Sequence, residues 1–131
     1  MAPLSSPAAT ARIVIVDDDD YVREVTAMVL AGAGHSVRAT ASGLEALRWL
    51  EQDPWDVLFI DLRMPEIDGP MLYREVLARW PTAAAHVVFI SGMAEMPHYD
   101  DTVKALKVPV LSKPFTLEQL HAAVARVLAT I

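Results

Sequence analysis

Residues 57–69, VLFIDLRMPEIDG, carry the strongest fold signal in this sequence. Four apolar residues at 57–60 end abruptly in the carboxylate of Asp61, and Pro65 and Gly69 lie in the turn that follows. A short apolar run bounded by turn residues is typical of a strand buried on both faces of a parallel sheet. Chemistry in such sheets sits just beyond the carboxyl ends of the strands, so Asp61 is a candidate reactive group. The alternative interpretation is an aspartate that caps a helix or a turn.

Length and composition indicate one globular domain, because the chain has 131 residues, 53% of them hydrophobic and 21% charged. The net charge of −6 argues against direct binding of nucleic acid, which needs clustered lysine and arginine. The absence of cysteine excludes disulfides, thiolate metal sites and cysteine nucleophiles, and is compatible with the cytosol. No apolar stretch approaches the roughly 20 residues that span a membrane, so we expect no membrane contact. Residues 1–10, MAPLSSPAAT, predict a flexible leader rather than a secretory signal, which leaves residues 11–131 for the folded domain.

Strand and helix patterns alternate five times along the chain. The apolar and β-branched runs predict strands at residues 13–16, 37–40, 57–60, 86–90 and 108–111. The helical spacings predict helices at residues 21–31, 43–52, 69–80, 95–106 and 117–129. The fourth of these is the least regular, because Pro97 can begin a helix but cannot sit inside one. Five repeats of strand then helix predict a parallel sheet covered by helices on both faces.

The spacing of apolar residues predicts which face of each helix is buried. The expected inward residues are Val22, Val25 and Val29 in the first helix, Ala46, Leu47 and Leu50 in the second, Leu72, Val76 and Trp80 in the third, and Leu117, Leu120, Val124 and Val127 in the last. Two capping boxes, Ser42 with Glu45 and Thr116 with Gln119, predict where the second and last helices begin.

Polar residues follow the ends of four predicted strands. The first strand runs into Asp17 and Asp18, the third into Asp61, the fourth into Ser91, and Lys113 follows the fifth. Three carboxylates at one sheet edge suit a hard, octahedral cation such as Mg²⁺, and a hydroxyl with an ammonium completes a pocket for a phosphoryl group. One carboxylate would then act as the nucleophile and form an acyl phosphate. Taken singly, each residue also has an ordinary interpretation as part of a solvated acidic run, a cap or a surface lysine.

Four signatures resemble those of the response-regulator receiver domains of two-component signal transduction, the CheY-like superfamily. They are IVIVDDDD at 13–20, LFIDLRMPEIDG at 58–69, VVFISG at 87–92 and LSKPF at 111–115. The resemblance extends from about residue 12 to the end of the chain. It implies a three-layer α/β fold, flavodoxin-like, with a doubly wound, five-stranded parallel sheet built as (βα)5 in the strand order 2-1-3-4-5.

The resemblance implies a role for each residue of the acidic pocket. Asp61 becomes the phosphoacceptor, and Asp17 and Asp18 become the pair that holds Mg²⁺, with Asp18 the better candidate for a direct ligand. Arg63, two residues beyond the phosphoacceptor, would supply a backbone carbonyl to the metal. Mn²⁺ is expected to substitute for Mg²⁺.

The resemblance also implies a conformational switch. Ser91 occupies the Ser/Thr switch position, Lys113 pairs with the acidic residues and later with the phosphoryl group, and the Lys113–Pro114 bond is expected to be cis. The family often carries an aromatic residue three positions before the lysine, where this chain has Val110. Valine cannot make the inward swing of an aromatic ring, so we expect any signal to be read through the order of the fourth helix.

The implied function is a phosphoacceptor. A sensor histidine kinase or a histidine phosphotransfer protein would transfer a phosphoryl group to Asp61, and an output protein would bind the face made by the fourth helix, fifth strand and fifth helix. The domain would be no enzyme with a separate substrate, although it assists its own phosphotransfer and dephosphorylation, and it is expected in the cytoplasm. The sequence stops directly after the last helix, so we expect no output domain. The chain would then be either a stand-alone regulator or a receiver excised from a larger protein such as a hybrid kinase, and the leader that begins at Met1 favours the first.

Two alternatives remain open from the sequence. One is a receiver-like interaction module that works without phosphorylation. The other is a metal-dependent phosphatase with an aspartate nucleophile, such as the haloacid-dehalogenase-like enzymes. Those enzymes place the nucleophile after the first strand and a second aspartate two residues later, where this chain has Arg63 after Asp61, and the chain has no room for a cap domain.

Overall fold

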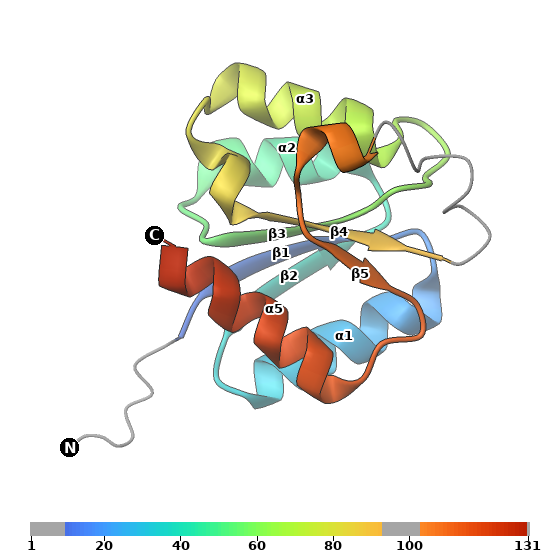
Figure 1. Cartoon of the computed structure of the whole chain (residues 1–131), viewed down its shortest axis with the longest axis vertical. Coiled ribbons are helices and arrows are strands. Elements are labelled where there is room, and N and C mark those ends of the chain that lie inside the picture. The colour runs from blue at the N-terminus through green and yellow to red at the C-terminus, as the bar shows by residue number, and fades with distance from the viewer. Residues whose placement is uncertain (1–9, 93–102, 131) are drawn as a thin grey trace.

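A five-stranded parallel sheet forms the centre of the computed structural model, which describes residues 10–92 and 103–130 (Figure 1). The strands are β1 (Arg12–Val16), β2 (Ser36–Thr40), β3 (Val57–Asp61), β4 (Val87–Ser91) and β5 (Val110–Ser112). Their order is β2-β1-β3-β4-β5 and every pair is parallel, which confirms the predicted topology. The expected leader lies outside the described residues, apart from Thr10.

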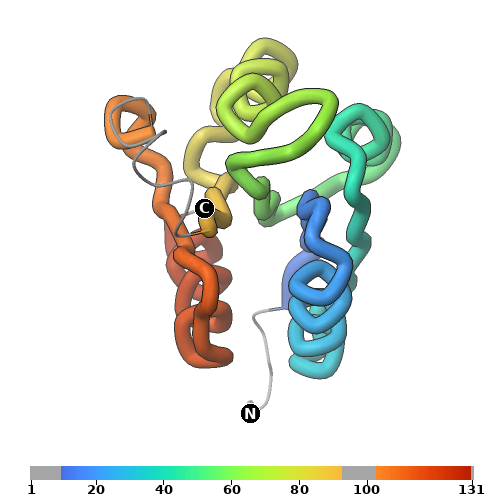
Figure 2. Tube along the Cα trace, turned by 90° about the vertical axis from the view of Figure 1, so that its right-hand side faces the viewer, coloured from blue at the N-terminus to red at the C-terminus, as the bar shows by residue number. Residues whose placement is uncertain are grey.

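Helices cover both faces of the sheet, as Figure 2 shows from the side. The helices α1 (Asp20–Gly32) and α5 (Leu117–Thr130) pack on one face, and α2 (Gly43–Gln52) and α3 (Gly69–Arg79) pack on the other. Alternate residues of β1 enter the two cores: Ile13 and Ile15 pack on the α1/α5 side, and Val14 and Val16 pack on the α2/α3 side. Because both faces are covered, all five residues of β3 and all five of β4 are buried.

Most of the predicted inward helix faces are confirmed, but α1 and α5 differ in part. The buried residues of α1 are Thr26 and Leu30, whereas Val25 is 36% exposed. The inward face of α1 is therefore rotated by about one residue from the predicted stripe. In α5 burial begins one turn into the helix at Leu120, and Leu117, its first residue, is 59% exposed.

The predicted strand boundaries need two corrections. His86 does not open β4 but ends the short 3-10 helix η1 (Ala83–His86), and its Nδ1 lies 2.8 Å from the carbonyl oxygen of Asp56. The last strand begins at Val110 rather than at residue 108, because Pro109 has no backbone N–H to donate to the ladder. The predicted helix at 95–106 lies mostly outside the described residues, although residues 103–106 are helical.

One predicted capping box forms completely and the other forms by half. Thr116 and Gln119 exchange both expected hydrogen bonds, at 2.9 and 3.0 Å. At α2 the Glu45 N–H donates to Ser42 Oγ at 3.1 Å, but the Glu45 carboxylate accepts from the hydroxyl of Thr40 instead of from the Ser42 N–H. Among the described helices, none combines the length and the apolar character needed to cross a membrane.

Candidate functional site

The structure gives the four consecutive aspartates four different environments. Asp17 directly follows β1 and is fully buried, whereas Asp18 is exposed at the edge of the pocket. Asp19 is the N-cap of α1 and accepts a backbone N–H of the first turn at 3.1 Å. Asp20 forms an ion pair of 2.7 Å with Arg23. Only the first two aspartates therefore remain available to the pocket, as the sequence predicted.

Lys113 joins the ends of β1 and β3. Its Nζ lies 3.2 Å from Asp17 Oδ1 and 3.3 Å from Asp61 Oδ2, and its backbone N–H donates to Ser91 O at 2.7 Å. The other carboxylate oxygen of Asp61 accepts the backbone N–H of Arg63 at 3.2 Å. One ammonium thus faces two buried carboxylates, which leaves a net negative charge in the pocket.

This imbalance shifts the protonation of the pocket. Burial, together with the nearby carboxyl of Asp17, raises the pKa of Asp61 to about 8, although the Arg63 N–H and the Lys113 ammonium oppose the shift. Burial works to lower the pKa of Lys113, but the charges of Asp61 and Asp17 outweigh it and raise that pKa. Asp61 therefore favours its protonated form near neutral pH unless a further cation enters the site.

The residues fit a hard divalent cation. Carboxylate oxygens of Asp17, Asp18 and Asp61 lie within 4.8 Å of one another. Among the described residues, Asp17 Oδ2 is the one buried side-chain oxygen or nitrogen without a hydrogen-bond partner. A buried carboxylate oxygen without a donor is costly, and a cation that prefers oxygen ligands would satisfy it.

The residues that the resemblance assigns to a conformational switch lie at the predicted strand ends. Ser91 is fully buried, and its hydroxyl donates to Gly92 O at 3.0 Å. The Lys113–Pro114 bond is cis, as expected from the resemblance. Val110 is half-buried and packs against the core on the α2/α3 side. The structure relates Arg63 to Asp61 through its backbone N–H, so a role for its carbonyl as a metal ligand stays a prediction.

Sequence reasoning missed three residues that shape this site. Arg23 donates from a guanidinium nitrogen to the carbonyl of Asp17 at 2.9 Å. Thr40 O accepts the Asp17 N–H at 3.0 Å, and a Cβ on Gly69 would lie 2.7 Å from Asp61 O. The available signal for Arg23 was a cation in the first turn of a helix, where the helix dipole favours anions.

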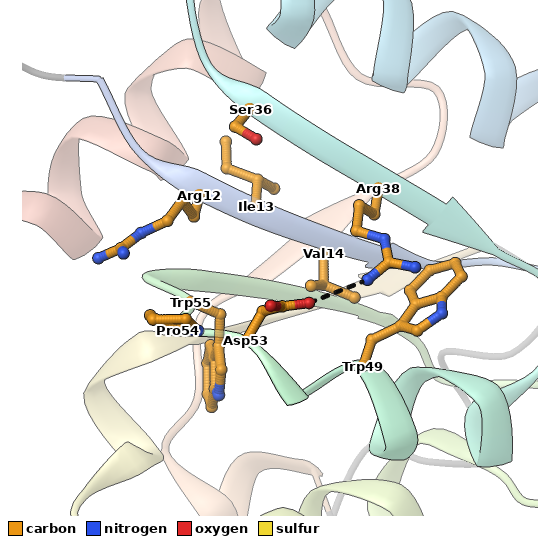
Figure 3. Close-up of a pocket in the computed structure, with 9 residues that line it drawn as sticks. All are labelled: Arg12, Ile13, Val14, Ser36, Arg38, Trp49, Asp53, Pro54 and Trp55. Carbon is orange, nitrogen blue, oxygen red and sulfur yellow. Dashed lines mark hydrogen bonds and ion pairs between the residues drawn. The ribbon is translucent and has the colours of Figure 1, made fainter. Parts of the chain in front are cut away.

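A separate cavity of about 280 Å³ lies far from these residues, beside the amino-terminal halves of β1 and β2 (Figure 3). Its walls include the indoles of Trp49 and Trp55. The guanidinium of Arg38 stacks 4.0 Å from the ring centre of Trp49 and pairs with Asp53 at 3.5 Å. None of the predicted site residues lines this cavity.

The chain is similar to several known proteins. The family model described as response regulator receiver domain matches residues 13–125. The sensor kinase CckA of Brucella abortus is 35% identical over 123 residues, which are 92% of this chain but only 13% of CckA. The response regulator receiver protein CpdR of the same species is 33% identical, over 83% of this chain and 89% of CpdR. A crystal structure of a putative response regulator from Chloroflexus aurantiacus superposes with a TM-score of 0.79 at 32% identity, over 92% of this chain and 98% of the other.

Proposed function

This chain belongs to the response regulator receiver domain family, and on that premise we propose that Asp61 accepts a phosphoryl group in a reaction that requires Mg²⁺. The observation that supports the proposal most is the position of Asp61 at the end of β3. There its carboxylate lies beside the Lys113 ammonium, and one of its oxygens lies within 4.8 Å of carboxylate oxygens of Asp17 and Asp18. Asp17, Asp18, Asp61 and the backbone carbonyl of Arg63 would hold the ion. Mn²⁺ would substitute, because the donors are all oxygen atoms.

The reaction is an in-line displacement at phosphorus. An ionised oxygen of Asp61 forms the new P–O bond while the bond from phosphorus to the donor's histidine nitrogen breaks and that nitrogen keeps the electron pair. Lys113 can donate to a phosphoryl oxygen, since its Nζ already lies 3.3 Å from Asp61 Oδ2. When bound, Mg²⁺ supplies charge neutralisation for the carboxylates and the transferred group. The domain assists this transfer and the later hydrolysis, but it has no separate substrate and is not an enzyme in that sense.

Ser91 and Lys113 would carry the signal away from the site. The Ser91 hydroxyl would exchange its bond to Gly92 O for one to a phosphoryl oxygen. Because the Lys113 N–H donates to Ser91 O at 2.7 Å, movement of Ser91 acts on the end of β5. The partner face is then the predicted fourth helix with β5 and α5. Val110 has no aromatic ring that could change its rotamer, so phosphorylation would shift the populations of two conformations of this face without an aromatic switch.

A stripe on α1 is suited to the phosphodonor. Tyr21, Val25 and Met28 are 76%, 36% and 71% exposed, and their spacing places them on one side of the helix. The helix begins at Asp20, two residues after Asp18, so the stripe starts close to the acidic pair at Tyr21. Large exposed apolar side chains gathered in one place mark interaction surfaces. A histidine-bearing domain of a kinase or phosphotransfer protein is the proposed occupant, as suits a relative of the sensor kinase CckA.

The proposal concerns the domain and includes no direct contact with nucleic acid or membrane. We place the domain in the cytoplasm, a location with which the absence of cysteine is compatible. A receiver-like module that binds partners without phosphorylation is the second candidate, and the experiment below separates the two.

Intact mass spectrometry tests the proposal. The wild-type protein is incubated with Mg²⁺ and acetyl phosphate, or with a phosphohistidine donor if acetyl phosphate gives no product. One phosphoryl group should be added to the wild type, and none without Mg²⁺ or in Asp61→Asn. Failure of both donors, with Mg²⁺ binding demonstrated, would contradict phosphotransfer and favour the interaction module.

A further inference from the structure

The guanidinium of Arg23 in α1 makes two contacts, one of which is to the backbone of the acidic pair Asp17 and Asp18. One guanidinium nitrogen donates to the backbone carbonyl of Asp17 at 2.9 Å, and the other pairs with the Asp20 carboxylate at 2.7 Å. The Arg23 side chain is only 17% exposed, whereas that of Asp20 is 80% exposed. An exposed ion pair contributes little, so the contact with the Asp17 carbonyl is the more consequential one.

The backbone of Asp17 is held from both sides. Its N–H donates to Thr40 O at 3.0 Å, and its carbonyl accepts from Arg23. The side chain is held at one oxygen, because Asp17 Oδ1 accepts from the Asp19 N–H at 2.9 Å and from Lys113 at 3.2 Å. These contacts fix the direction of Asp17 Oδ2, the buried oxygen without a partner among the described residues.

The contact with Arg23 also governs Asp18. The carbonyl oxygen of Asp17 and the nitrogen of Asp18 belong to one planar peptide unit. A hydrogen bond that fixes this oxygen therefore fixes the direction in which the chain continues to Asp18. Asp18 is the exposed member of the pair, and its side chain forms no hydrogen bond or ion pair with the described residues, so its position depends on this peptide plane.

We propose that Arg23 is a positioning residue that sets Asp17 and Asp18 for binding a divalent cation. The inference rests on the proposed function, because it concerns the same metal site. Arg23 acts through the Asp17–Asp18 peptide and touches neither the phosphoryl group nor the metal. Arginine suits the task because its planar fork reaches two acceptors at fixed geometry, whereas a lysine ammonium is a point charge on a flexible stem.

The direction in which Mg²⁺ affinity changes on removal of Arg23 distinguishes a positioning role from a purely electrostatic one. A fixed cation near a cation site repels the incoming ion, so removal of Arg23 would tighten Mg²⁺ binding if only its charge mattered. If Arg23 holds the ligands in place, its removal weakens binding instead. Loss of a residue that orients metal ligands typically reduces metal affinity by roughly 10-fold or more.

Calorimetric titration with Mg²⁺ provides the test. The dissociation constant of Arg23→Met should rise about 10-fold, and that of Arg23→Lys should rise several-fold although the charge is kept. Asp20→Asn should change it by less than about 2-fold. The matched control is Arg48→Met, since Arg48 is also paired with an acidic residue three positions away on a helix, Glu45, but lies away from the site.

A measurement on the metal-free protein checks the same inference independently. Amide hydrogen exchange at Asp18 and Asp19 should accelerate in Arg23→Met and Arg23→Lys, and stay unchanged in Arg48→Met. Unchanged or tighter Mg²⁺ binding in both Arg23 variants would overturn the positioning role while leaving phosphotransfer intact. A wild-type protein that binds no Mg²⁺ would overturn this inference and the metal dependence of the proposed function together. If Arg23→Met does not fold, the Mg²⁺ affinity and amide exchange of Arg23→Lys provide the test.

Discussion

Asp61 meets two opposing requirements at one position. Burial and the nearby Asp17 favour its protonated form, with a pKa of about 8, whereas the proposed attack on phosphorus requires the ionised form. The Lys113 ammonium and a bound cation favour the ionised form. In the absence of metal, ionising Asp61 in the folded protein therefore lowers its stability, as is common for functional residues.

Asp61→Asn should stabilise the metal-free protein. The folded-state pKa of Asp61 lies above the unfolded value of 3.8, so the wild type loses stability as the pH rises from about 4 to about 8. The advantage of the variant should be small at pH 4 and reach at least about 1 kcal/mol at pH 8. Urea denaturation of both proteins across this pH range, in the presence of a chelator, measures the difference. An advantage that does not grow with pH would contradict the assigned environment of Asp61.

Gly69 lets the start of α3 approach the end of β3. A Cβ at this position would lie 2.7 Å from Asp61 O and 2.7 Å from the Cα of Leu62. Neither of these backbone atoms can move away without also moving Asp61. Gly69→Ala should therefore destabilise the fold by about 1–3 kcal/mol and slow phosphorylation.

The matched control for Gly69→Ala is Gly32→Ala at the end of α1. A Cβ on Gly32 has nothing within 4 Å, so that variant should be neutral or slightly more stable, because alanine is the better helix former. Denaturation midpoints and labelling rates of the two variants give the comparison. Equal effects at both glycines would show that the close approach at Gly69 does not matter.

Single residues of the site could be predicted where they follow a strand, but not where they act through a contact with the backbone. Asp17, Asp61, Ser91 and Lys113 follow apolar runs, and parallel strands bring such positions to one edge. Arg23 acts on a carbonyl group six residues earlier, and neither its distance along the sequence nor its residue type identifies that acceptor.

At the scale of elements, strands were predicted better than helix faces. All residues of β3 and β4 are buried, so their continuous apolar runs have one simple explanation. Helix α1 is different because it carries apolar residues on two sides. One side, with Leu30, packs on the sheet, and the other, with Tyr21 and Met28, is exposed. Periodicity alone could not decide which side faces inward, and the prediction that Val25 is buried was wrong for this reason.

The exposed side of α1 gives a prediction about the donor. Met28→Gln should reduce the rate of phosphotransfer from a histidine-bearing domain by about 10-fold or less, because one apolar contact is worth roughly 1 kcal/mol. Labelling by acetyl phosphate should not change. Leu44→Gln on α2 is the control, since Leu44 is 56% exposed on a different helix. Stopped-flow measurement of the phosphotransfer rate from one donor to both variants gives the comparison. An equal loss of rate in both would contradict docking of the donor on α1.

At the scale of the whole molecule, the two cores and the site occupy separate regions. The apolar clusters lie on the two faces of the sheet, and the polar groups gather at the carboxyl edge. The strand order was predicted through the family resemblance and is confirmed. The first residue of β5 was predicted wrongly. The apolar run at 108–111 includes Pro109, which has no backbone N–H to donate to the neighbouring strand, so β5 begins at Val110. Residues 95–102, which belong to the predicted fourth helix of the proposed partner face, lie outside the described residues.

Chemical identification of the phosphorylated residue distinguishes Asp61 from the other acidic residues. The protein is labelled with acetyl phosphate and Mg²⁺, and the acyl phosphate is then reduced with borohydride, which converts a phosphorylated aspartate into homoserine. Peptide mass spectrometry should find homoserine at position 61 and nowhere else. Homoserine at Asp17, Asp18 or Asp68 in place of Asp61, or a stable adduct on a hydroxyl side chain, would contradict the proposal that Asp61 accepts the phosphoryl group.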